Sequence, residues 1–456
     1  MMEEDQTPTS WIAAELEGVS LPDQRFAANV IAITGQLEEH TGFSFSGACG
    51  ERLRKSAWRL FSTEELDLLA VHQQRTLERC ASEDTILVVE DTTDIHYRQP
   101  HKQGMGILGG TKTRVARGLN MHTALAVTVQ GECLGIVHQQ IWAPKAGRGT
   151  TDRRQFALED KETIKWIKTL KAVNSCWAQQ QQQQVVIVAD READFFEHYA
   201  QPRRDNVRLL VRVLHKERKV CYHQQYLSIE EVFSQLSPLG EGSVRVWRRP
   251  HKKLKERTAL VQYYAATVTL PATYKRKQPP QTLQLVWIKE QPSAEIAEPI
   301  EWILLTDLAV ASLQQAITTG HYYALRWVIE RFHFILKSGL GIEQLQIDLL
   351  LRLTNALQLY ALVAWHLLWL QRLGKAHSEQ AATDYIELQT IEAAATVSGK
   401  QIITVKDFLL VTAALGGFIP TKKQPLPGEK TLWLGIQQLH AICNGFRAAK
   451  LKYGTS

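Results

Sequence analysis

Two unbroken apolar runs restrict the fold of this chain more than any other feature of its sequence. The first, residues 86–89, continues into Glu90 and Asp91, and the second, residues 185–189, is followed directly by Asp190. Strands that are apolar at every position are typical of a parallel or mixed sheet, because both faces of such a sheet are covered. We therefore predict an α/β protein in which two buried strands each end at an aspartate.

Helical patterns lie on both sides of these strands. Residues 11–69 are predicted to be mainly helical, and an amphipathic helix at 51–61 carries Arg52, Lys55 and Arg59 on one face. This face is a candidate for docking on phosphates, with plain solvation as the alternative. Further predictions are a helix at 155–173, a β-rich piece between 206 and 306, a helix at 311–337 with a break near Gly320, and an apolar core helix at 349–370.

Length and cysteine content limit the class of protein. At roughly 100 to 200 residues per domain, the 456 residues suggest two to four structural units. The six cysteines include no CxxC pair, which argues against a zinc ribbon or a disulfide framework and favours a reducing compartment. Residues 1–5 are acidic where a signal peptide would be basic and then apolar. We expect a multi-domain protein that stays in the cytoplasm.

Positive charge is concentrated in one stretch of the chain. Residues 203–257 contain 14 Lys and Arg against 6 Asp and Glu, a local charge of +8, so the remainder of a chain of net charge +6 sums to −2. A basic strip in an otherwise balanced chain suggests a polyanionic partner, and nucleic acid is the commonest such partner. The alternative is a solvated charged face.

One glycine motif is judged to be misleading. Gly104-x-Gly106-x-x-Gly109 matches the dinucleotide-binding pattern. However, no strand runs directly into it, and a basic turn follows where a helix should begin. We predict a glycine-rich hairpin or loop here and no nucleotide cofactor.

Carboxylates at the predicted strand ends are the first candidate site. Asp91 and Asp190 would converge at one edge of the sheet, because side chains at the carboxyl ends of neighbouring strands meet there. Two such aspartates can hold Mg²⁺ or Mn²⁺, which prefer anionic oxygen ligands. Each aspartate taken alone could instead cap a turn or a helix, Asp190 especially.

A stripe of polar side chains on the helix after Gly320 supports the site interpretation. Its members are Tyr323, Arg326, Glu330 and Lys337. Their spacing places them at about 0°, −60°, −20° and −40° around a helix of about 100° per residue, opposite an apolar face formed by Leu325, Val328, Phe332 and Leu336. A carboxylate flanked by two cations and a phenol suits metal ligation beside a phosphate. Two aspartates and one glutamate are the equipment for two-metal phosphoryl transfer.

These motifs resemble those of a known family. The matching stretches are residues 89–93 (VEDTT), 190–194 (DREAD), the Tyr323, Arg326, Glu330 and Lys337 set in its YREK spacing, and shorter segments at 57–61, 161–166, 301–306 and 415–418. The chain resembles the DDE cut-and-paste transposases of the insertion-sequence-four family, in particular the Tn-five (IS-fifty) type. The resemblance covers nearly the whole chain and is weakest at about 220–299 and 375–411.

The resemblance implies a fold and a division into domains. An RNase H-like (ribonuclease H-like) DDE catalytic core would span 71–372, interrupted by a β-rich insertion at about 206–300. An N-terminal helical domain at 1–70 would bind transposon-end DNA, and a C-terminal helical domain at 373–456 would dimerise. It also implies a bacterial, nucleoid-associated homodimer that acts on double-stranded DNA and has no membrane partner.

The resemblance also implies roles for individual residues. Asp91, Asp190 and Glu330 would be the catalytic residues and would ligate two Mg²⁺ ions, with Mn²⁺ as an alternative. Tyr323, Arg326 and Lys337 would hold a phosphate of the transposon end, Trp302 would stack a base flipped out of the duplex, and Arg212 and Arg191 would add DNA contacts. One site would nick the end, form a hairpin, reopen the hairpin and join the 3′-OH to target DNA, each step being an in-line displacement at phosphorus.

Two other functions remain as alternatives. A stand-alone nuclease of the same fold would need the carboxylates but not the Tyr323, Arg326, Glu330 and Lys337 stripe, Trp302 or a dimerisation section. A catalytically inert DNA-binding relic or inhibitor would not need all three carboxylates, and all three are present here.

Overall fold

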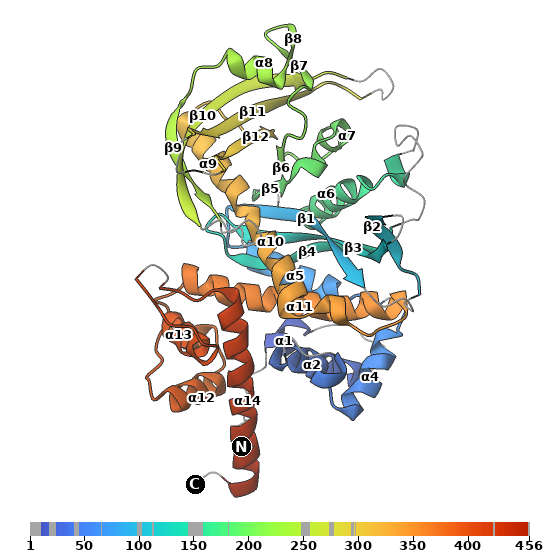
Figure 1. Ribbon diagram of the computed structural model, residues 1–456, viewed down its shortest axis with the longest axis vertical. Coiled ribbons are helices and arrows are strands. Elements are labelled where there is room, and N and C mark those ends of the chain that lie inside the picture. Colours follow the sequence, from blue (N-terminus) through green and yellow to red (C-terminus); the bar gives the residue numbers. More distant parts are fainter. Residues whose placement is uncertain are drawn as a thin grey trace.

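The computed structural model defines most of the chain. It describes residues 11–17, 24–40, 45–64, 66–97, 103–111, 114–144, 158–180, 182–247, 256–272, 278–292, 296, 298–422 and 425–454. These residues form one large mixed sheet, helices on both faces of its central strands, and helical parts at both ends of the chain (Figure 1). The predicted α/β class is confirmed.

The sheet has twelve strands among the described residues. Its order is β2-β3-β1-β5-β6-β12-β11-β10-β7-β8, with β4 pairing with β3 and β9 pairing with β10. The strands are β1 (Thr85–Tyr97), β2 (Gly106–Thr111), β3 (Arg114–Thr128), β4 (Cys133–Trp142), β5 (Gln184–Ala189), β6 (Val207–Arg212), β7 (Lys219–Tyr222), β8 (Gln225–Ser228), β9 (Gly240–Val246), β10 (Arg257–Leu270), β11 (Gln281–Glu290) and β12 (Glu301–Thr306).

The central strands combine both kinds of pairing. β3 pairs with β1 and with β4 in antiparallel fashion, whereas β1 pairs with β5, and β5 with β6, in parallel. A parallel pair needs a long crossover connection. Helix α6 (Ile164–Cys176) lies within the connection from β4 to β5, and it begins later and ends later than the predicted helix at 155–173, part of which lies outside the described residues.

Both faces of the two apolar strands are buried, which explains why their sequences do not alternate. Val88 and Ile187 pack on one face in a cluster with Trp166 of α6. Val89 and Val188 belong to the cluster on the other face, which includes Phe332. Since successive side chains of a strand point to opposite faces, every position must be apolar when helices cover both.

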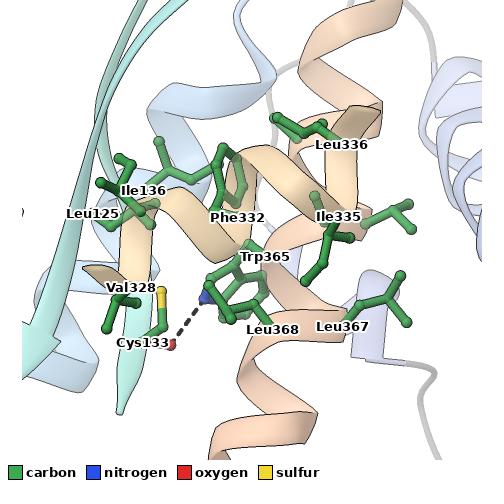
Figure 2. Close-up of a cluster of buried hydrophobic side chains, with 14 of the residues drawn as sticks. Leu125, Cys133, Ile136, Val328, Phe332, Ile335, Leu336, Trp365, Leu367 and Leu368 are labelled. Atoms are coloured by element: carbon green, nitrogen blue, oxygen red, sulfur yellow. Dashed lines mark hydrogen bonds between the residues drawn. The ribbon is translucent and has the colours of Figure 1, made fainter. Parts of the chain in front are cut away.

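Helices α5 (Leu68–Cys80), α10 (Trp327–Phe334) and α11 (Leu350–Ala376) cover this second face. Figure 2 shows Val328, Phe332 and Leu336 packed with residues of β3, β4 and α11, and the indole Nε1 of Trp365 donates to the carbonyl of Cys133 at 3.1 Å. Val328, Phe332 and Leu336 are fully buried. The predicted apolar face of this helical stretch is therefore confirmed.

The β-rich piece continues the same sheet. β12 pairs with β6, and β11, β10, β7 and β8 extend the sheet from there. Figure 1 shows these strands as the upper part of the molecule, beyond the central strands. A short helix, α8 (Ile229–Ser234), follows β8 and begins with a capping box formed by Ser228 and Glu231.

The predicted helix break near Gly320 is wrong. Helix α9 (Leu313–Leu325) runs through Gly320 and ends five residues later, and Arg326 links it to α10. A β-carbon at position 320 would lie 2.8 Å from Ile288 Cδ1 and 3.1 Å from Tyr263 Cε1. The glycine therefore allows the helix to approach the sheet closely, and it does not interrupt the helix.

The glycine motif at 104–109 lies in a hairpin, as predicted. Gly106 and Gly109 belong to β2, which pairs with β3 through a bulge between Ile107 and Gly109. A β-carbon at Gly106 would lie 2.2 Å from the carbonyl oxygen of Pro144, so the strand tolerates only glycine there. No helix follows this motif in the described part of the hairpin.

Helical parts at both ends of the chain pack on α11. The N-terminal helices are α1 (Trp11–Glu15), α2 (Gln24–Glu39), α3 (Phe45–Ala48) and α4 (Glu51–Phe61), and the C-terminal helices are α12 (Leu388–Ser398), α13 (Val405–Leu415) and α14 (Glu429–Tyr453). Helices α2, α4, α13 and α14 contact α11, and α14 also contacts α2. Figure 1 shows α11 between the sheet and the N-terminal helices.

Helix α11 is a core helix, as the sequence predicted. Its segment Leu350–Gly374 is long and apolar enough to cross a membrane, but 83 % of its most apolar window is buried inside the protein. Among the described residues it is the one helix that meets this length and composition test. The polar Gln358, which interrupts the apolar run, accepts from the Leu68 amide at 2.9 Å and donates to the Leu66 carbonyl at 2.9 Å.

Candidate active site

Asp91 and Asp190 lie on neighbouring parallel strands, at the same level. The parallel ladder of β1 and β5 ends at the pair Val89 and Val188. Asp91 and Asp190 each come two residues after this last pair, so the two aspartates lie alongside one another. The prediction that β1 ends at the aspartate is wrong, however, because β1 continues to Tyr97 and keeps pairing with β3. What ends near Asp91 is the pairing with β5.

Asp190 does cap a helix, as the alternative interpretation allowed. Its Oδ1 accepts from the Glu192 amide at 2.8 Å and begins the short 3₁₀ helix η3 (Arg191–Ala193). Oδ1 of Asp91 similarly accepts from the Thr92 amide at 2.7 Å. In both aspartates a local backbone bond fixes one carboxylate oxygen, so the side chains are held in place.

Arg326 joins the strand carboxylates to the helix. Its Nη1 donates to Asp91 Oδ2 at 2.9 Å, and its Nη2 donates to Glu330 Oε1 at 3.0 Å. Arg326 sits at the junction of α9 and α10, so Glu330 is one turn further along the second helix. The arginine thus brings together two carboxylates that are far apart in the sequence.

The predicted stripe is confirmed for its first three members and changed for the fourth. Tyr323 is buried, Arg326 retains 13 % exposure of its side chain and Glu330 retains 35 %. The helix then widens into a π-helical turn, η5 (Ile335–Gly339), which contains Lys337. The angle of about 100° per residue, which was used to place Lys337 on the stripe, does not apply through a π-helical turn. Lys337 Nζ lies 3.8 Å from Glu343 Oε1.

Charge and burial shift the acidity of this cluster. Burial raises the pKa of Asp91 to about 7; Arg326 opposes this shift, while Asp190 and Glu330 add to it by repulsion. Burial also raises the pKa of Asp190. The pKa of Arg326 is raised because the attraction of Asp91, Tyr323, Glu330 and Asp190 outweighs its burial. Asp190 and Glu330 are therefore both close enough to Asp91 to repel its carboxylate, beside a single guanidinium.

The donor set of the cluster suits a hard divalent cation. Three carboxylates face one guanidinium, which leaves an excess of two negative charges, and carboxylate oxygens are the ligands that Mg²⁺ and Mn²⁺ prefer. Within the described ranges, no three His, Cys, Asp or Glu side chains are already arranged tightly enough to hold a metal ion. Arg326 stands between Asp91 and Glu330 in this arrangement.

Trp302 and Arg212 lie beside the same helix junction. Trp302 of β12 is 7 % exposed, and its ring packs edge-on against Tyr323 with centroids 5.1 Å apart. Arg212 of β6 donates to the Glu301 carbonyl at 3.0 Å, and burial lowers its pKa. They share a small pocket, whose lining is Arg212, Arg245, Val246, Trp247, Trp302, Tyr323, Ala324, Arg326 and Trp327.

Sequence reasoning missed Trp247 as part of this pocket. Its indole donates to the Ala324 carbonyl at 3.0 Å, and the guanidinium carbons of Arg245 and Arg372 lie 4.1 Å and 4.8 Å from its ring centroid. An aromatic residue inside a basic stretch was the available signal. Trp247 is far from the helix junction in the sequence, so no local pattern indicated this contact.

Arg191 and Arg59 are both exposed but lie in different parts of the molecule. Arg191 opens η3 directly after Asp190 and lines a second pocket with Arg212 and Lys216. Arg59 lies on α4, which packs on α2 and α11. The structure therefore places Arg191 next to the carboxylates, whereas Arg59 belongs to the N-terminal helices.

Many charges of the basic stretch at 203–257 are compensated. Six of its cations form ion pairs, namely Arg203 with Asp307, Lys216 with Glu301, Arg218 with Asp194, Lys219 with Glu231, Arg245 with Glu256 and Arg257 with Glu290. Residues 248–255, which hold five more of its cations, lie outside the described residues. Among the described residues, much of this charge is therefore paired within the protein.

Comparison with known families identifies the C-terminal part of the chain. Residues 362–456 match the family model described as the transposase Tn5 dimerisation domain. The chain thus carries a Tn5-type transposase dimerisation domain at its C-terminus.

Proposed function

We propose that this protein is a DDE transposase that moves an insertion sequence by cutting it out of DNA and joining it to a target. In this proposal the strands β1 to β5 belong to an RNase H-like core, and the insertion at about 206–300 holds β6 to β11. The relationship that carries the proposal is the Arg326 bridge between Asp91 and Glu330, with Asp190 on the adjacent strand, in a chain that also holds a Tn5 dimerisation domain.

Asp91, Asp190 and Glu330 would hold two Mg²⁺ ions, or Mn²⁺ in their place. Bound there, the ions would activate the attacking oxygen and stabilise the leaving oxygen of an in-line displacement. The chain itself contributes rigid placement, because backbone amides fix one oxygen of each aspartate. The reactions in this proposal are end nicking, hairpin formation, hairpin opening and strand transfer.

The cations and aromatic residues around the junction of α9 and α10 would hold the DNA end. Arg326 suits a phosphate because its planar guanidinium can donate two parallel hydrogen bonds, and Lys337 would add a point charge. Tyr323 and Trp302 already pack together at the pocket. We assign a flipped base to Trp302, since stacking of about 1 to 3 kcal/mol offsets part of the cost of unstacking. Arg212 and Arg191 would contact nearby phosphates.

Two further assignments complete the proposal. The N-terminal helices, including Arg59 on its exposed helix, would bind the ends of the element. The C-terminal domain would pair two copies of the chain as a homodimer that brings the two ends together. The protein would act in the bacterial cytoplasm on nucleoid DNA.

The direct test is excision by the purified full-length chain. The protein would be incubated with Mg²⁺ and a duplex that contains the DNA flanking its gene. We expect cleavage at the element ends, loss of cleavage in Asp91→Ala, Asp190→Ala and Glu330→Ala, and end binding retained in all three. Full cleavage by any of these variants would refute the catalytic assignment.

The main alternative, a stand-alone nuclease, predicts a different product. A nuclease would release cut ends without joining them to a second DNA. The dimerisation domain favours the transposase, because joining requires two ends to be held together. Adding a target plasmid to the same reaction separates the two functions, since only the transposase yields joined products.

A further inference from the structure

Arg326 occupies the oxygen atoms that a metal would need. Oδ2 of Asp91 accepts from its Nη1 at 2.9 Å, and Oδ1 of the same carboxylate accepts from the Thr92 amide at 2.7 Å. On the other side, Oε1 of Glu330 accepts from Nη2 at 3.0 Å. Both oxygens of Asp91 are thus engaged, and the guanidinium lies between the two carboxylates.

This arrangement compensates the site only in part. Asp91 and Arg326 retain 15 % and 13 % side-chain exposure, so bulk solvent and its ions reach them poorly. One guanidinium cannot neutralise Asp91, Asp190 and Glu330 together, and the uncompensated charge attracts a further cation. Divalent ions bind carboxylates through the same lone pairs that the guanidinium now uses.

The arginine also has a second place to go. It lines the pocket that it shares with Arg212, Trp302 and Trp327, and none of the three carboxylates belongs to that lining. Its backbone lies at the junction of two helices, where α9 has ended and α10 begins. A change of side-chain rotamer can therefore turn the guanidinium from the carboxylates toward this pocket without moving either helix.

We infer that Arg326 is a placeholder for the metal: it bridges Asp91 and Glu330 while no metal is bound, and it turns to a DNA phosphate when a divalent cation takes those oxygens. This inference rests on the proposed function. It makes metal and DNA binding cooperative, because each ligand favours the same position of the arginine. It also explains how Asp91 and Glu330 stay together without metal.

Metal binding in the absence of DNA tests the placeholder. Titration of the full-length protein with Mn²⁺, followed by calorimetry, should show that Arg326→Gln binds Mn²⁺ roughly ten- to a hundredfold more tightly than the wild type. Arg326→Lys keeps the charge but cannot bridge both carboxylates, so its affinity should lie between the two. Equal or weaker binding by Arg326→Gln would overturn the inference.

Lys337→Gln is the matched control for net charge. It removes one positive charge from the same helical region, but Lys337 approaches Glu343 instead of the two bridged carboxylates. Its Mn²⁺ affinity should stay within about twofold of the wild type, compared with typical couplings of about 5- to 150-fold. A gain equal to that of Arg326→Gln would mean that general charge, and not the bridge, sets the affinity. Circular dichroism of each variant confirms that the fold is kept.

The same titration in the presence of end DNA tests whether Arg326 turns to a DNA phosphate. Addition of end DNA should tighten Mn²⁺ binding in the wild type by roughly fivefold or more, and this coupling should be lost in Arg326→Gln. Undiminished coupling in the variant would exclude the arginine as the carrier.

Asp91→Ala distinguishes failure of the proposed active site from failure of the placeholder alone. Retention of wild-type Mn²⁺ binding in this variant would show that the metal is not held at Asp91, and the proposed active site would fail with the placeholder. Loss of binding in Asp91→Ala, combined with no change in Arg326→Gln, would remove only the placeholder.

Discussion

Nε2 of His122 lies 3.1 Å from Oε2 of Glu90, and both side chains are fully buried beneath the strand that carries Asp91. Nδ1 of the same imidazole lies 2.9 Å from Oγ1 of Thr92. His122 of β3 therefore bonds to both neighbours of Asp91, on the face of β1 opposite to the aspartate. The imidazole holds the strand at the position where its side chain enters the active site.

The Glu90 contact predicts that the amide variant is well tolerated. Burial, together with repulsion from Asp190 and Asp91, raises the pKa of Glu90 well above its usual range, while burial lowers the pKa of His122. Glu90 is therefore a neutral acid that can donate to the imidazole. Glu90→Gln keeps a donor, whereas Glu90→Ala should lower the free energy of unfolding by about 1 to 3 kcal/mol. Denaturant unfolding of both variants measures this, and equal losses would contradict a protonated Glu90.

His122→Ala should weaken catalysis as well as stability. Loss of both bonds frees β1 around Asp91, and a displacement of about 1 Å can cost roughly a hundredfold in rate. The measurement is first-strand nicking at saturating Mg²⁺, with His138→Ala as control, since His138 is a partly buried histidine on the neighbouring strand β4. A similar loss of nicking in both variants would show that His122 has no special positioning role.

Trp302 is predicted to matter more for the hairpin than for the first nick. In the proposed mechanism only hairpin formation would need the extruded base, so Trp302→Ala should slow it by roughly ten- to a hundredfold relative to nicking, as expected for a stacking contribution of about 1 to 3 kcal/mol. Since the side chain is buried against Tyr323, Trp302→Phe serves as control because it keeps an aromatic packing partner. Gel analysis of nicked and hairpin products gives both rates. Equal loss of both steps in Trp302→Ala would exclude the flipping role.

The dimerisation domain predicts an apolar contact surface at the C-terminus. Among the described residues of the matched region, five large apolar side chains are exposed, namely Leu388, Val397, Ile403, Ile419 and Phe446. Ile419 is the most exposed of these, at 79 %. Ile419→Asp should raise the dissociation constant of the dimer by at least about tenfold if this residue lies in the interface.

Sedimentation of the protein with end DNA measures that dimer. Leu260→Asp is the matched control, because Leu260 is 77 % exposed but lies on β10, outside the matched domain. A dimer as stable in Ile419→Asp as in Leu260→Asp would place the interface elsewhere.

The sequence predicted the parts of the site that depend on local pattern. Buried strands before Asp91 and Asp190 were recognisable because helices on both faces demand apolar residues throughout. The spacing of Tyr323, Arg326 and Glu330 was recognisable because one turn of helix separates them. These features need no knowledge of distant contacts.

Other features depend on long-range packing, which a local pattern does not contain. β1 continues past Asp91 because β3 still pairs with it. The helix breaks at Arg326 and not at Gly320, since the glycine serves a close contact with Ile288. The π-helical turn at Lys337 and the placement of Trp247 against Ala324 likewise arise from tertiary packing.

The contacts of Glu15 of α1 with His72 and Arg79 of α5 predict that the protein loses stability in acid. Burial raises the pKa of Glu15, but hydrogen bonds from His72 and Arg79, together with the charge of Arg79, outweigh it and lower the pKa from 4.5 to about 2. A carboxyl group with a depressed pKa stabilises the fold above its unfolded pKa, and that stability is lost as the pH falls from 4.5 toward about 2. His72 acts in the same direction, because burial lowers its pKa and Nε2 must stay unprotonated to accept from the Ile136 amide at 2.8 Å.

Glu15→Gln should therefore destabilise the protein near neutral pH by up to about 3 kcal/mol, and the difference from the wild type should shrink as the pH falls below about 4.5. Denaturant unfolding between neutral pH and pH 3 measures this difference. Glu17→Gln is the matched control, since Glu17 is 79 % exposed and pairs with Arg75 at the surface; it should change stability little, because exposed ion pairs contribute about 0 to 1 kcal/mol. A Glu15→Gln difference that stays constant down to pH 3 would mean that the ionised carboxylate does not hold α1 to α5.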